Sequence, residues 1–372
     1  MNPPSIVFIC GNGDTLYRFR LELIKSFIKK GFTVHAFAPE IPEDFLIELR
    51  DLGVIYHSIS FKRKTVNFFD TFISIWDIAK KLRKINPDIV FSYTHKAVIV
   101  GSISALLAGK LRSISLITGT GHIFDDHHFI QKIKRFIGIL GFKVSLLLSE
   151  IVFFQNPDDL ELFCSLGMVR KSKALLLNGS GVDLKKFSVE PLPDEPIFLC
   201  MSRLIKSKGL IEYAEAARLV KSKHPHARFL LYGFCDDHED SLDEQEIKDN
   251  WNSVYGIEYC GFTNDPVSTI SQSSIYVLLS YNEGTPRSVL EAMSMGRPII
   301  TTDVPGCRET VINGENGFLA IVRDSASAAA EMMKLLDSED RKIMGRKSRE
   351  LCENRYDVHK VNKAILLGLK IS

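Results

Sequence analysis

Strand-like and helical segments alternate along almost the whole chain, and this alternation constrains the fold more than any other feature. The first segment, SIVFIC at 5–10, is apolar and suits a buried strand. An amphipathic helical pattern follows over 16–31 and ends at Gly31, and a second strand-like segment occupies 33–38. Because each parallel strand needs a crossover connection, this pattern predicts a parallel sheet covered by helices.

The alternation continues to residue 179, and a second series begins at residue 197. In the first series we expect further strands at 54–59, 88–93, 113–118, 151–155 and 174–179, and helices over 43–52, 67–85, 96–109, 129–149 and 157–166. In the second series we expect strands at 197–202, 227–233, 257–262, 275–279, 298–302 and 317–321, helices over 208–223 and 242–252, and a helical tail over 338–372.

A proline-rich, acidic segment separates the two series. SVEPLPDEP, at 188–196, has three prolines and three acidic residues in nine positions, which is typical of a linker. A chain of 372 residues is also long enough for two domains. The sequence therefore predicts an α/β protein with two Rossmann-like, doubly wound domains, at 1–187 and 197–355.

The composition is that of an ordinary globular protein, with 45% hydrophobic and 25% charged residues. Seven cysteines are scattered without a C-x-x-C pair, which argues against a zinc ribbon or a disulfide framework and for a reducing cytosol. The first residues lack the features of a signal peptide, and no apolar run is long enough to span a bilayer. We therefore expect a cytoplasmic protein.

The stretch SYNEGTPRSVLEAMSMGRPIITT, at 280–302, is the part of the sequence that best indicates a function. A strand-like segment precedes it, and Pro286 suits the first turn of a helix, where its missing N–H costs nothing. Gly284 and Thr285 then leave backbone N–H groups at the amino end of that helix. Such a helix end is a natural site for an anion.

Glu283 and Glu291 lie on either side of this predicted anion site. A helix rises about 1.5 Å per residue, so Glu291 lies about 8 Å beyond Pro286. Carboxylates accept hydrogen bonds from paired hydroxyls, and the layout matches the sugar, diphosphate and ribose of a nucleotide sugar. The alternative is an amphipathic helix with two solvated glutamates.

The whole stretch resembles the Glu-x7-Glu signature of the retaining GT-B glycosyltransferases of family 4. In that family the first glutamate contacts the donor sugar and the second holds the ribose. The resemblance implies the GT-B architecture, in which two Rossmann-like domains face each other across a cleft. It also implies that the C-terminal helix, about 356–372, packs back on the N-terminal domain.

Arg203 and Lys208 lie in MSRLIKSKGL, between a strand that ends near Ser202 and the next helix. A departing diphosphate needs fixed positive charge, and an arginine can bind it through two parallel hydrogen bonds. The pair resembles the family's Arg-x4-Lys diphosphate motif in residue type, spacing and place. The alternative is that both are surface charges.

The form TPRSVLEA and the loop VPGCRE, at 304–309, are similar to family members that act on polyprenyl-diphosphate-linked sugars. Those members assemble O-antigens, capsules or bacterial N-glycans. From this resemblance we expect Arg287 to contact the donor phosphate or the acceptor diphosphate. Glu309 is expected near the uracil, or as a helix cap.

Gly11 and Gly13 follow the first strand, but the dinucleotide fingerprint G-x-G-x-x-G fails because its third position is Leu16. We interpret the two glycines as a loop that lets the backbone approach a donor phosphate, and a plain strand–helix turn is the alternative.

His95 and Lys96 follow the strand at 88–93, and His122 follows the strand at 113–118. Sites in α/β proteins form at such carboxyl ends, so these residues are candidates for contacting the sugar or the acceptor. Relatives often carry an aromatic residue where this chain has His122. A solvated histidine is the alternative at both positions.

The run Asp-Asp-His-His at 125–128 resembles a metal cluster in composition only. Adjacent residues rarely all face one ion, and no third ligand appears at a suitable spacing. We therefore expect no metal at this run and no cofactor. The resemblance also implies no metal, because in that family the arginine and the lysine supply the positive charge.

The segment 129–149 is a basic amphipathic helix in which Lys132, Lys134 and Arg135 interrupt apolar residues. Residues 1–188 contain 25 Lys and Arg against 17 Asp and Glu, whereas the remainder contains 22 against 28. With the basic run at 61–64, this helix is suited to an anionic membrane surface. A helix packed on the core with one wet face is the alternative.

The resemblance, together with these patterns, implies a retaining glycosyltransferase that moves a HexNAc from a UDP-sugar to a polyprenyl-diphosphate-linked saccharide. We expect it at the inner face of the cell membrane, bound peripherally, and without a nucleic-acid partner. Two alternatives share the fold: a UDP-HexNAc 2-epimerase, and a nucleotide-sugar-binding protein without catalysis.

Overall fold

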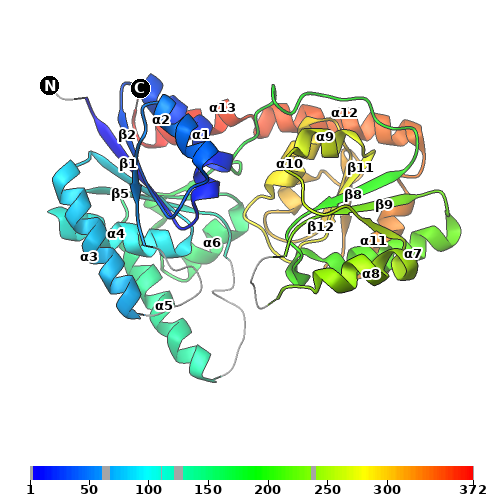
Figure 1. Cartoon of the computed structure of the whole chain (residues 1–372), viewed down its shortest axis with the longest axis horizontal. Helices are drawn as coiled ribbons and strands as arrows, with labels where there is room; N and C mark the ends of the chain where they lie inside the picture. Colours follow the sequence, from blue (N-terminus) through cyan, green and yellow to red (C-terminus); the bar gives the residue numbers. More distant parts are fainter. Residues whose placement is uncertain (1–2, 61–67, 110, 121–128, 236–239, 372) are drawn as a thin grey trace. The chain divides into compact units, whose positions relative to one another are not determined.

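The computed structural model describes residues 3–60, 68–109, 111–120, 129–235 and 240–371, and only the backbone at 68–69, 129–137 and 338 (Figure 1). The chain divides into two compact units. Unit 1 comprises Met1–Ser180 and Asn362–Ser372, and unit 2 comprises Gly181–Val361.

Unit 1 contains a seven-stranded parallel sheet in the order β3-β2-β1-β4-β5-β6-β7. Its strands are β1 (Ser5–Cys10), β2 (Thr33–Ala38), β3 (Ile55–Ser58), β4 (Ile89–Tyr93), β5 (Arg112–Ile117), β6 (Ile151–Phe154) and β7 (Ala174–Leu176). Its helices are α1 (Gly13–Lys29), α2 (Glu43–Asp51), α3 (Phe68–Ile85), α4 (His95–Gly109), α5 (Phe129–Leu148) and α6 (Pro157–Ser165), with a 3-10 turn, η2, at Lys171–Lys173.

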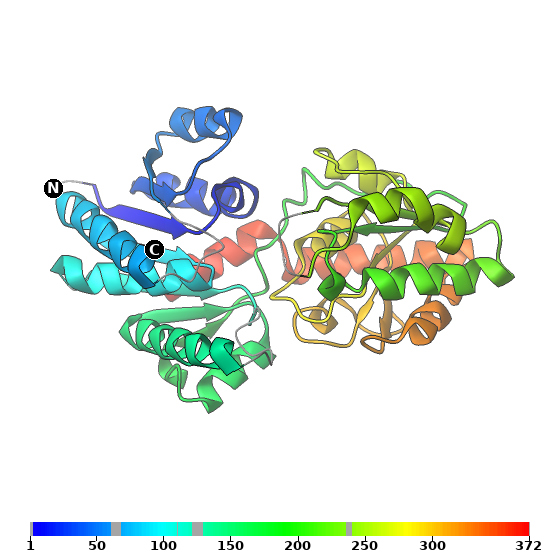
Figure 2. The same ribbon diagram turned by 60° about the horizontal axis from the view of Figure 1, so that its bottom comes forward.

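Helices α3 and α4 lie side by side on one face of this sheet (Figures 1 and 2). Val7 and Val90 of the sheet, Ile78 and Leu82 of α3, and Ala97 of α4 form one fully buried cluster. Burial of a valine, leucine or isoleucine side chain contributes about 1.5–3 kcal/mol, so this interface holds the central strands and their carboxyl ends in place.

Unit 2 contains a six-stranded parallel sheet in the order β10-β9-β8-β11-β12-β13. Its strands are β8 (Ile197–Met201), β9 (Arg228–Tyr232), β10 (Ile257–Tyr259), β11 (Ile275–Leu278), β12 (Ile299–Thr302) and β13 (Gly317–Ala320). Its helices are α7 (Leu210–Lys223), α8 (Glu244–Tyr255), α9 (Pro266–Ser271), α10 (Arg287–Ser294), α11 (Ser325–Met333), α12 (Ser338–Arg355) and the start of α13 (Val358–Gly368), with 3-10 turns η3 (Lys206–Lys208) and η4 (Arg308–Thr310). Both sheets are parallel throughout, and the predicted doubly wound fold class is confirmed.

Alternate residues of the unit 2 strands enter two separate cores. Phe198 and Phe229 pack with α7, α8 and α11, whereas Leu199, Leu230 and Tyr276 pack with α10 on the opposite face. This alternation follows from the two-residue repeat of a strand, and it fixes which face of the sheet each later residue points to.

Two element boundaries differ from the sequence prediction for visible reasons. Helix α1 begins three residues earlier than expected, because the Asn12 side chain caps it by accepting a hydrogen bond from the Asp14 N–H at 3.0 Å. The tail is two helices rather than one. It breaks where the Tyr356 carbonyl accepts from Val182 N at 2.7 Å and Val358 N donates to the Val182 carbonyl at 3.0 Å.

The segment 188–196, expected as a linker, lies within unit 2. The buried Arg297 donates hydrogen bonds to the carbonyl oxygens of Glu190 at 2.8 Å and Pro191 at 3.1 Å, and Arg341 donates to the Asp194 carbonyl. Burial lowers the pKa of Arg297 to about 10, so it remains charged at neutral pH. The chain passes between the units at Ser180–Gly181 and returns at Val361–Asn362.

Candidate functional site

The residues expected to act on the donor meet at one edge of the unit 2 sheet. Strands β8 and β11 are neighbours, and parallel strands end at the same edge. Arg203 and Lys208 follow β8, and Glu283 follows β11. The sheet order therefore brings together residues that are 75 positions apart in the sequence, as for Lys208 and Glu283.

Lys208 and Glu283 form an ion pair in which the lysine Nζ donates to the glutamate Oε1. Their side chains are only 17% and 16% exposed, so the pair is partly shielded from water. Arg203 is half-buried and lies in the loop between β8 and the turn that carries Lys208. The arrangement places positive charge beside the first predicted glutamate, as a site for a departing diphosphate requires.

The turn that carries Lys208 is fixed by contacts with two other loops. Asp240 accepts hydrogen bonds from Ser207 N at its carboxylate, at 2.7 Å, and from Lys206 N at its carbonyl, at 2.9 Å. The Ser207 carbonyl in turn accepts from Tyr281 N at 2.9 Å. The lysine turn is thereby tied to the loop that carries Glu283.

Two glycines allow the loops of the site to approach each other closely. Gly209 has φ +69°, and a Cβ there would lie 2.0 Å from the Leu279 carbonyl oxygen. Gly306 has φ +81°, and its Cβ would lie 2.2 Å from the carbonyl oxygen of Glu283. Glu283 N also donates to the Pro305 carbonyl at 3.2 Å. Only glycine satisfies both the positive φ and the space, so these positions support the site directly.

Helix α10 begins at Arg287, with Pro286 as its N-cap residue rather than in its first turn as predicted. Arg287 Nε donates to Glu291 Oε1 at 3.1 Å, and the two side chains are 18% and 14% exposed. Both residues thus lie on one side of α10, one turn apart. The arginine holds the carboxylate that is expected to bind the ribose.

The glycine loop of unit 1 has a structural explanation. Gly11 lies between β1 and α1, and Gly13 is the first residue of α1, which Asn12 caps. A Cβ on Gly13 would lie 2.6 Å from Ile41 and 2.8 Å from the Glu40 carbonyl oxygen. The loop at 39–41 therefore requires Gly13 to lack a side chain, whether or not a phosphate approaches it.

His95 and Lys96 form the first turn of α4, at the carboxyl end of β4. A ring nitrogen of His95, Nε2, lies 2.8 Å from the Gly119 carbonyl oxygen, and the ring contacts Phe142 edge to face. Burial lowers the pKa of Lys96, opposed by the charge of Asp70. His122 and the run 125–128 lie outside the described residues.

The part of the chain that the structure describes contains neither a metal cluster nor a membrane-spanning helix. Within it, no three His, Cys, Asp or Glu side chains are grouped so that they could hold a metal ion. None of its helices combines the length and the apolar character needed to cross a bilayer.

Two family models match the chain, one on each unit. The model described as glycosyl transferases group 1 matches residues 182–351, and the model described as glycosyl transferase 4-like matches residues 7–154. The chain is a group 1 glycosyltransferase. The enzyme class predicted from the sequence is confirmed, and neither model is one of an epimerase.

Named relatives of this glycosyltransferase act on lipid-linked sugars. The N,N'-diacetylbacillosaminyl-diphospho-undecaprenol alpha-1,3-N-acetylgalactosaminyltransferase of Campylobacter jejuni is 28% identical over 348 residues, which are 90% of each protein. The UDP-Gal:alpha-D-GlcNAc-diphosphoundecaprenol alpha-1,3-galactosyltransferase of Escherichia coli is 24% identical over 305 residues, covering 77% of this chain and 76% of that one.

A solved structure extends the likeness over almost the whole glycosyltransferase. HepE of Anabaena, crystallised in complex with UDP, superposes with a TM-score of 0.77 at 18% identity, covering 98% of this chain and 99% of that one. This likeness shows the shared GT-B fold.

Several residues that support the site of this glycosyltransferase had no signal in the sequence. Asp240 fixes the lysine turn from 33 positions away. Tyr281 donates to Glu212 at 2.8 Å, and the Arg323 guanidinium lies 4.6 Å from the centre of its ring. Burial, followed by this hydrogen bond, raises the pKa of Tyr281 to about 12. These contacts hold the residue that lies two positions before Glu283.

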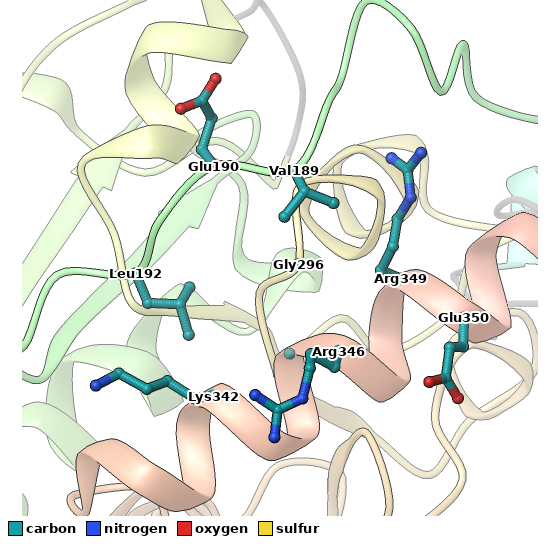
Figure 3. Close-up of a pocket in the computed structure, with 9 residues that line it drawn as sticks. Val189, Glu190, Leu192, Gly296, Lys342, Arg346, Arg349 and Glu350 are labelled. Carbon is teal, nitrogen blue, oxygen red and sulfur yellow. The ribbon is translucent and has the colours of Figure 1, made fainter.

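A pocket of about 350 Å³ lies elsewhere in unit 2 and contains none of the predicted site residues (Figure 3). Its lining includes Leu192, which precedes β8, Gly296, which precedes β12, and Lys342 and Arg346 of α12. Because the strands are parallel, the pocket lies at their amino ends, opposite the edge that carries Lys208. The pocket is therefore separate from the predicted donor-site residues at the carboxyl edge.

Proposed function

We propose that this glycosyltransferase moves a HexNAc from a UDP-sugar to a polyprenyl-diphosphate-linked saccharide with retention of the anomeric configuration. The Lys208–Glu283 ion pair carries this proposal, because it places a cation and a carboxylate together at the carboxyl edge of the unit 2 sheet. The names of the relatives support the donor and the acceptor, since one names UDP-Gal and both name a diphospho-undecaprenol.

Each residue of the edge has a role in the proposed reaction. The donor diphosphate lies against Arg203 and Lys208, with the sugar at Glu283 and the ribose at Glu291. Lys208 then exchanges its bond with Glu283 for bonds with the phosphate. The exchange frees the carboxylate to accept from sugar hydroxyls, so the unliganded pair keeps both groups in position without leaving a buried charge unpaired.

The bond that breaks joins C1 of the donor sugar to the diphosphate oxygen. The acceptor hydroxyl oxygen forms the new bond from the same face of the ring, and its proton passes to the departing diphosphate. Positive charge develops on the sugar, as in glycosidases, and negative charge develops on the leaving group beside Arg203 and Lys208. We propose that these cations take the place of a metal, so activity persists in EDTA.

We propose that the reaction takes place at the inner face of the cell membrane, where the acceptor's lipid tail stays in the bilayer. We propose that unit 1 binds that surface through the basic helix at 129–149, because the basic residues of the chain are concentrated in its first half. Peripheral binding of this kind needs no membrane-spanning helix.

The proposal is tested by incubating the enzyme with a panel of UDP- and GDP-sugars and short-chain polyprenyl diphosphate sugars, with EDTA present. Product mass identifies the donor, and the anomeric coupling constant of the product reports retention. Inverted product, or an absolute requirement for Mg²⁺ or Mn²⁺, would contradict the mechanism. A change in the free UDP-sugar without an acceptor would instead identify an epimerase, and donor binding without UDP release a non-catalytic protein.

A further inference from the structure

Tyr281, two residues before Glu283, is held from two sides by side chains that have no role in the reaction described above. Its hydroxyl donates a hydrogen bond to Glu212 Oε1 at 2.8 Å. The guanidinium carbon of Arg323 lies 4.6 Å from the centre of its ring. A hydrogen bond at one end of the side chain and a cation on its face together fix the orientation of the ring.

The backbone of Tyr281 connects the two partners of the central ion pair. Its N–H donates to the Ser207 carbonyl at 2.9 Å, and the Ser280 hydroxyl donates to the same carbonyl at 3.2 Å. Ser207 directly precedes Lys208, and Lys208 pairs with Glu283. A shift of Tyr281 would therefore move the lysine turn and the glutamate loop together.

Two neighbouring helices bring the side chains that hold Tyr281 to this place. Helices α7 and α11 lie side by side. Glu212 belongs to the first turn of α7, and Arg323 comes two residues before α11. The Asp324 side chain caps α11 by accepting from Ser327 N at 2.9 Å, which fixes the chain directly after Arg323.

Both Arg323 and Glu212 carry a feature that costs stability. Arg323 has φ +60°, and among the described residues of unit 2 every other positive φ belongs to a glycine. An L side chain is strained in this left-handed region. Glu212 Oε2 is buried and has no hydrogen-bond partner within the described part of the chain, which is also unfavourable. Strain of this kind is concentrated at functional sites, where the surrounding structure imposes it.

We infer that Arg323 and Glu212 form a brace around Tyr281 that positions Lys208 and Glu283. The inference rests on the proposed function, in which Lys208 exchanges its bond with Glu283 for bonds with the donor phosphate. Arg323 and Glu212 do not touch the reactants in that reaction, so both are positioning residues. Misplacing a reacting group by about 1 Å can slow a reaction by about 10²-fold, so a brace of this kind affects the rate.

The test combines steady-state kinetics, thermal unfolding and hydrogen exchange of the full-length enzyme. Arg323→Gly removes the guanidinium and also relieves the left-handed backbone, whereas Arg323→Lys keeps a cation and serves as the rescue. Tyr281→Phe keeps the ring and loses the bond to Glu212. Lys370→Gly is the matched control, because Lys370 is also exposed with φ +60° but belongs to unit 1.

We expect Arg323→Gly to lower kcat by about 10-fold while the donor KM stays within about twofold, because the brace positions groups that act in the transition state. Its unfolding midpoint should not fall, since relief of the backbone strain offsets the lost contact with the ring. The peptide 280–284 should exchange faster in Arg323→Gly and not in Lys370→Gly. Arg323→Lys should keep most of the activity, and Tyr281→Phe should lower kcat by a smaller factor than Arg323→Gly.

Unchanged exchange of 280–284 in Arg323→Gly would overturn the inference, and so would faster exchange with an unaltered kcat. A lower unfolding midpoint, with kcat and donor affinity reduced equally, would overturn it too, because Arg323 would then support only the fold. A wild-type enzyme that transfers sugar from none of the donors would instead refute the proposed function. Hydrogen exchange alone would then decide whether the brace holds this loop.

Discussion

The two sheets have the same parallel, doubly wound topology, yet their carboxyl edges are built differently. In unit 2 the edge carries a half-buried ion pair, Lys208 with Glu283, and glycines that leave no room for a side chain. In unit 1 the edge carries a capping residue, Asn12, and a histidine, His95, that contacts a backbone carbonyl. Topology supplies a place for a site, and the residues decide which of the two edges can stabilise charge.

The largest expected effect tests this difference directly. Changing Lys208 or Arg203 to Ala should lower kcat by about 10²–10³, as removal of a charge stabiliser does. Lys96→Ala, which removes a lysine from the equivalent edge of unit 1, should lower kcat far less. Steady-state kinetics of the three variants, with circular dichroism to confirm folding, decide between them. Equal losses in all three would mean that the two edges share the chemistry.

Glu291 provides the second test, because it separates binding of the donor from bond cleavage. Glu291→Ala should lower kcat/KM, mainly through a higher KM for the donor, if the carboxylate accepts hydrogen bonds from both ribose hydroxyls. The lost transition-state stabilisation should be about 2–4 kcal/mol. Arg287→Ala is the companion variant, because it removes the ion pair between Arg287 and the Glu291 carboxylate. A folded Glu291→Ala enzyme with unchanged donor kinetics would leave this carboxylate with no role in the donor site.

The third test compares how basic residues of the two units contribute to binding of an anionic membrane surface. Changing Lys132, Lys134 and Arg135 together to Glu should abolish sedimentation with anionic liposomes, because each basic residue at such a surface contributes about 1 kcal/mol. Wild-type binding should weaken with added salt, which screens charge over about 8 Å at physiological ionic strength. The variant should keep its affinity for UDP.

Binding that persists in the triple variant would show that this helix packs on the core instead of binding lipid. A matched control reverses three charges in unit 2, at Lys342, Arg346 and Lys347 of α12, all of them exposed. That variant should sediment like wild type if unit 1 alone binds the surface.

The fold and the central residues of the edge could be predicted from the sequence, because both depend on local patterns. Alternating strands and helices identify a parallel sheet, and the Glu283 stretch and the Arg203–Lys208 pair are short motifs at strand ends. The Arg287–Glu291 pair is likewise a one-turn helical pair that spacing alone can suggest.

Contacts between distant segments could not be predicted in this way. Asp240 accepts a hydrogen bond from Ser207 N, and the Arg323 guanidinium stacks on the Tyr281 ring. Both contacts form only because the sheet order brings their loops together. The packing of 188–196 on Arg297 was missed for the same reason, since its prolines and acids alone indicate a linker.

A smaller effect isolates the close approach of Gly306 to Glu283. Gly306→Ala places a Cβ at positive φ and 2.2 Å from the Glu283 carbonyl oxygen, whereas Gly31→Ala in unit 1 has the same φ of +81° with nothing within 4 Å. Both changes cost about 1–2 kcal/mol of stability through the left-handed backbone. Only Gly306→Ala should also lower kcat, because Glu283 must shift. Equal activity of the two variants, measured beside their unfolding free energies, would mean that the contact is dispensable.

The smallest effect concerns the sensitivity of stability to pH between about 7.5 and 5.5, which should be greater in unit 1. His35 Nδ1 and His57 Nε2 lie 3.0 Å apart on β2 and β3. Burial lowers the pKa of both, with smaller contributions from His57 on His35 and from Lys81 on His57. A folded-state pKa below the ordinary 6.5 means that the unfolded chain takes up protons first as the pH falls. Stability is therefore complete above pH 6.5 and declines below it.

Hydrogen exchange can locate this decline, because it reports on each sheet separately. Between about pH 7.5 and pH 5.5, after correction for intrinsic exchange, protection of β2 and β3 should fall more than that of β9 and β10. The buried Tyr213 and Tyr276 of unit 2 do not contribute, since burial raises their pKa and both stay protonated throughout this range. His57→Gln removes one of the two titrating groups and keeps a hydrogen-bonding side chain beside His35. It should reduce the fall in β2 and β3, and an undiminished fall would assign the acid sensitivity to other groups.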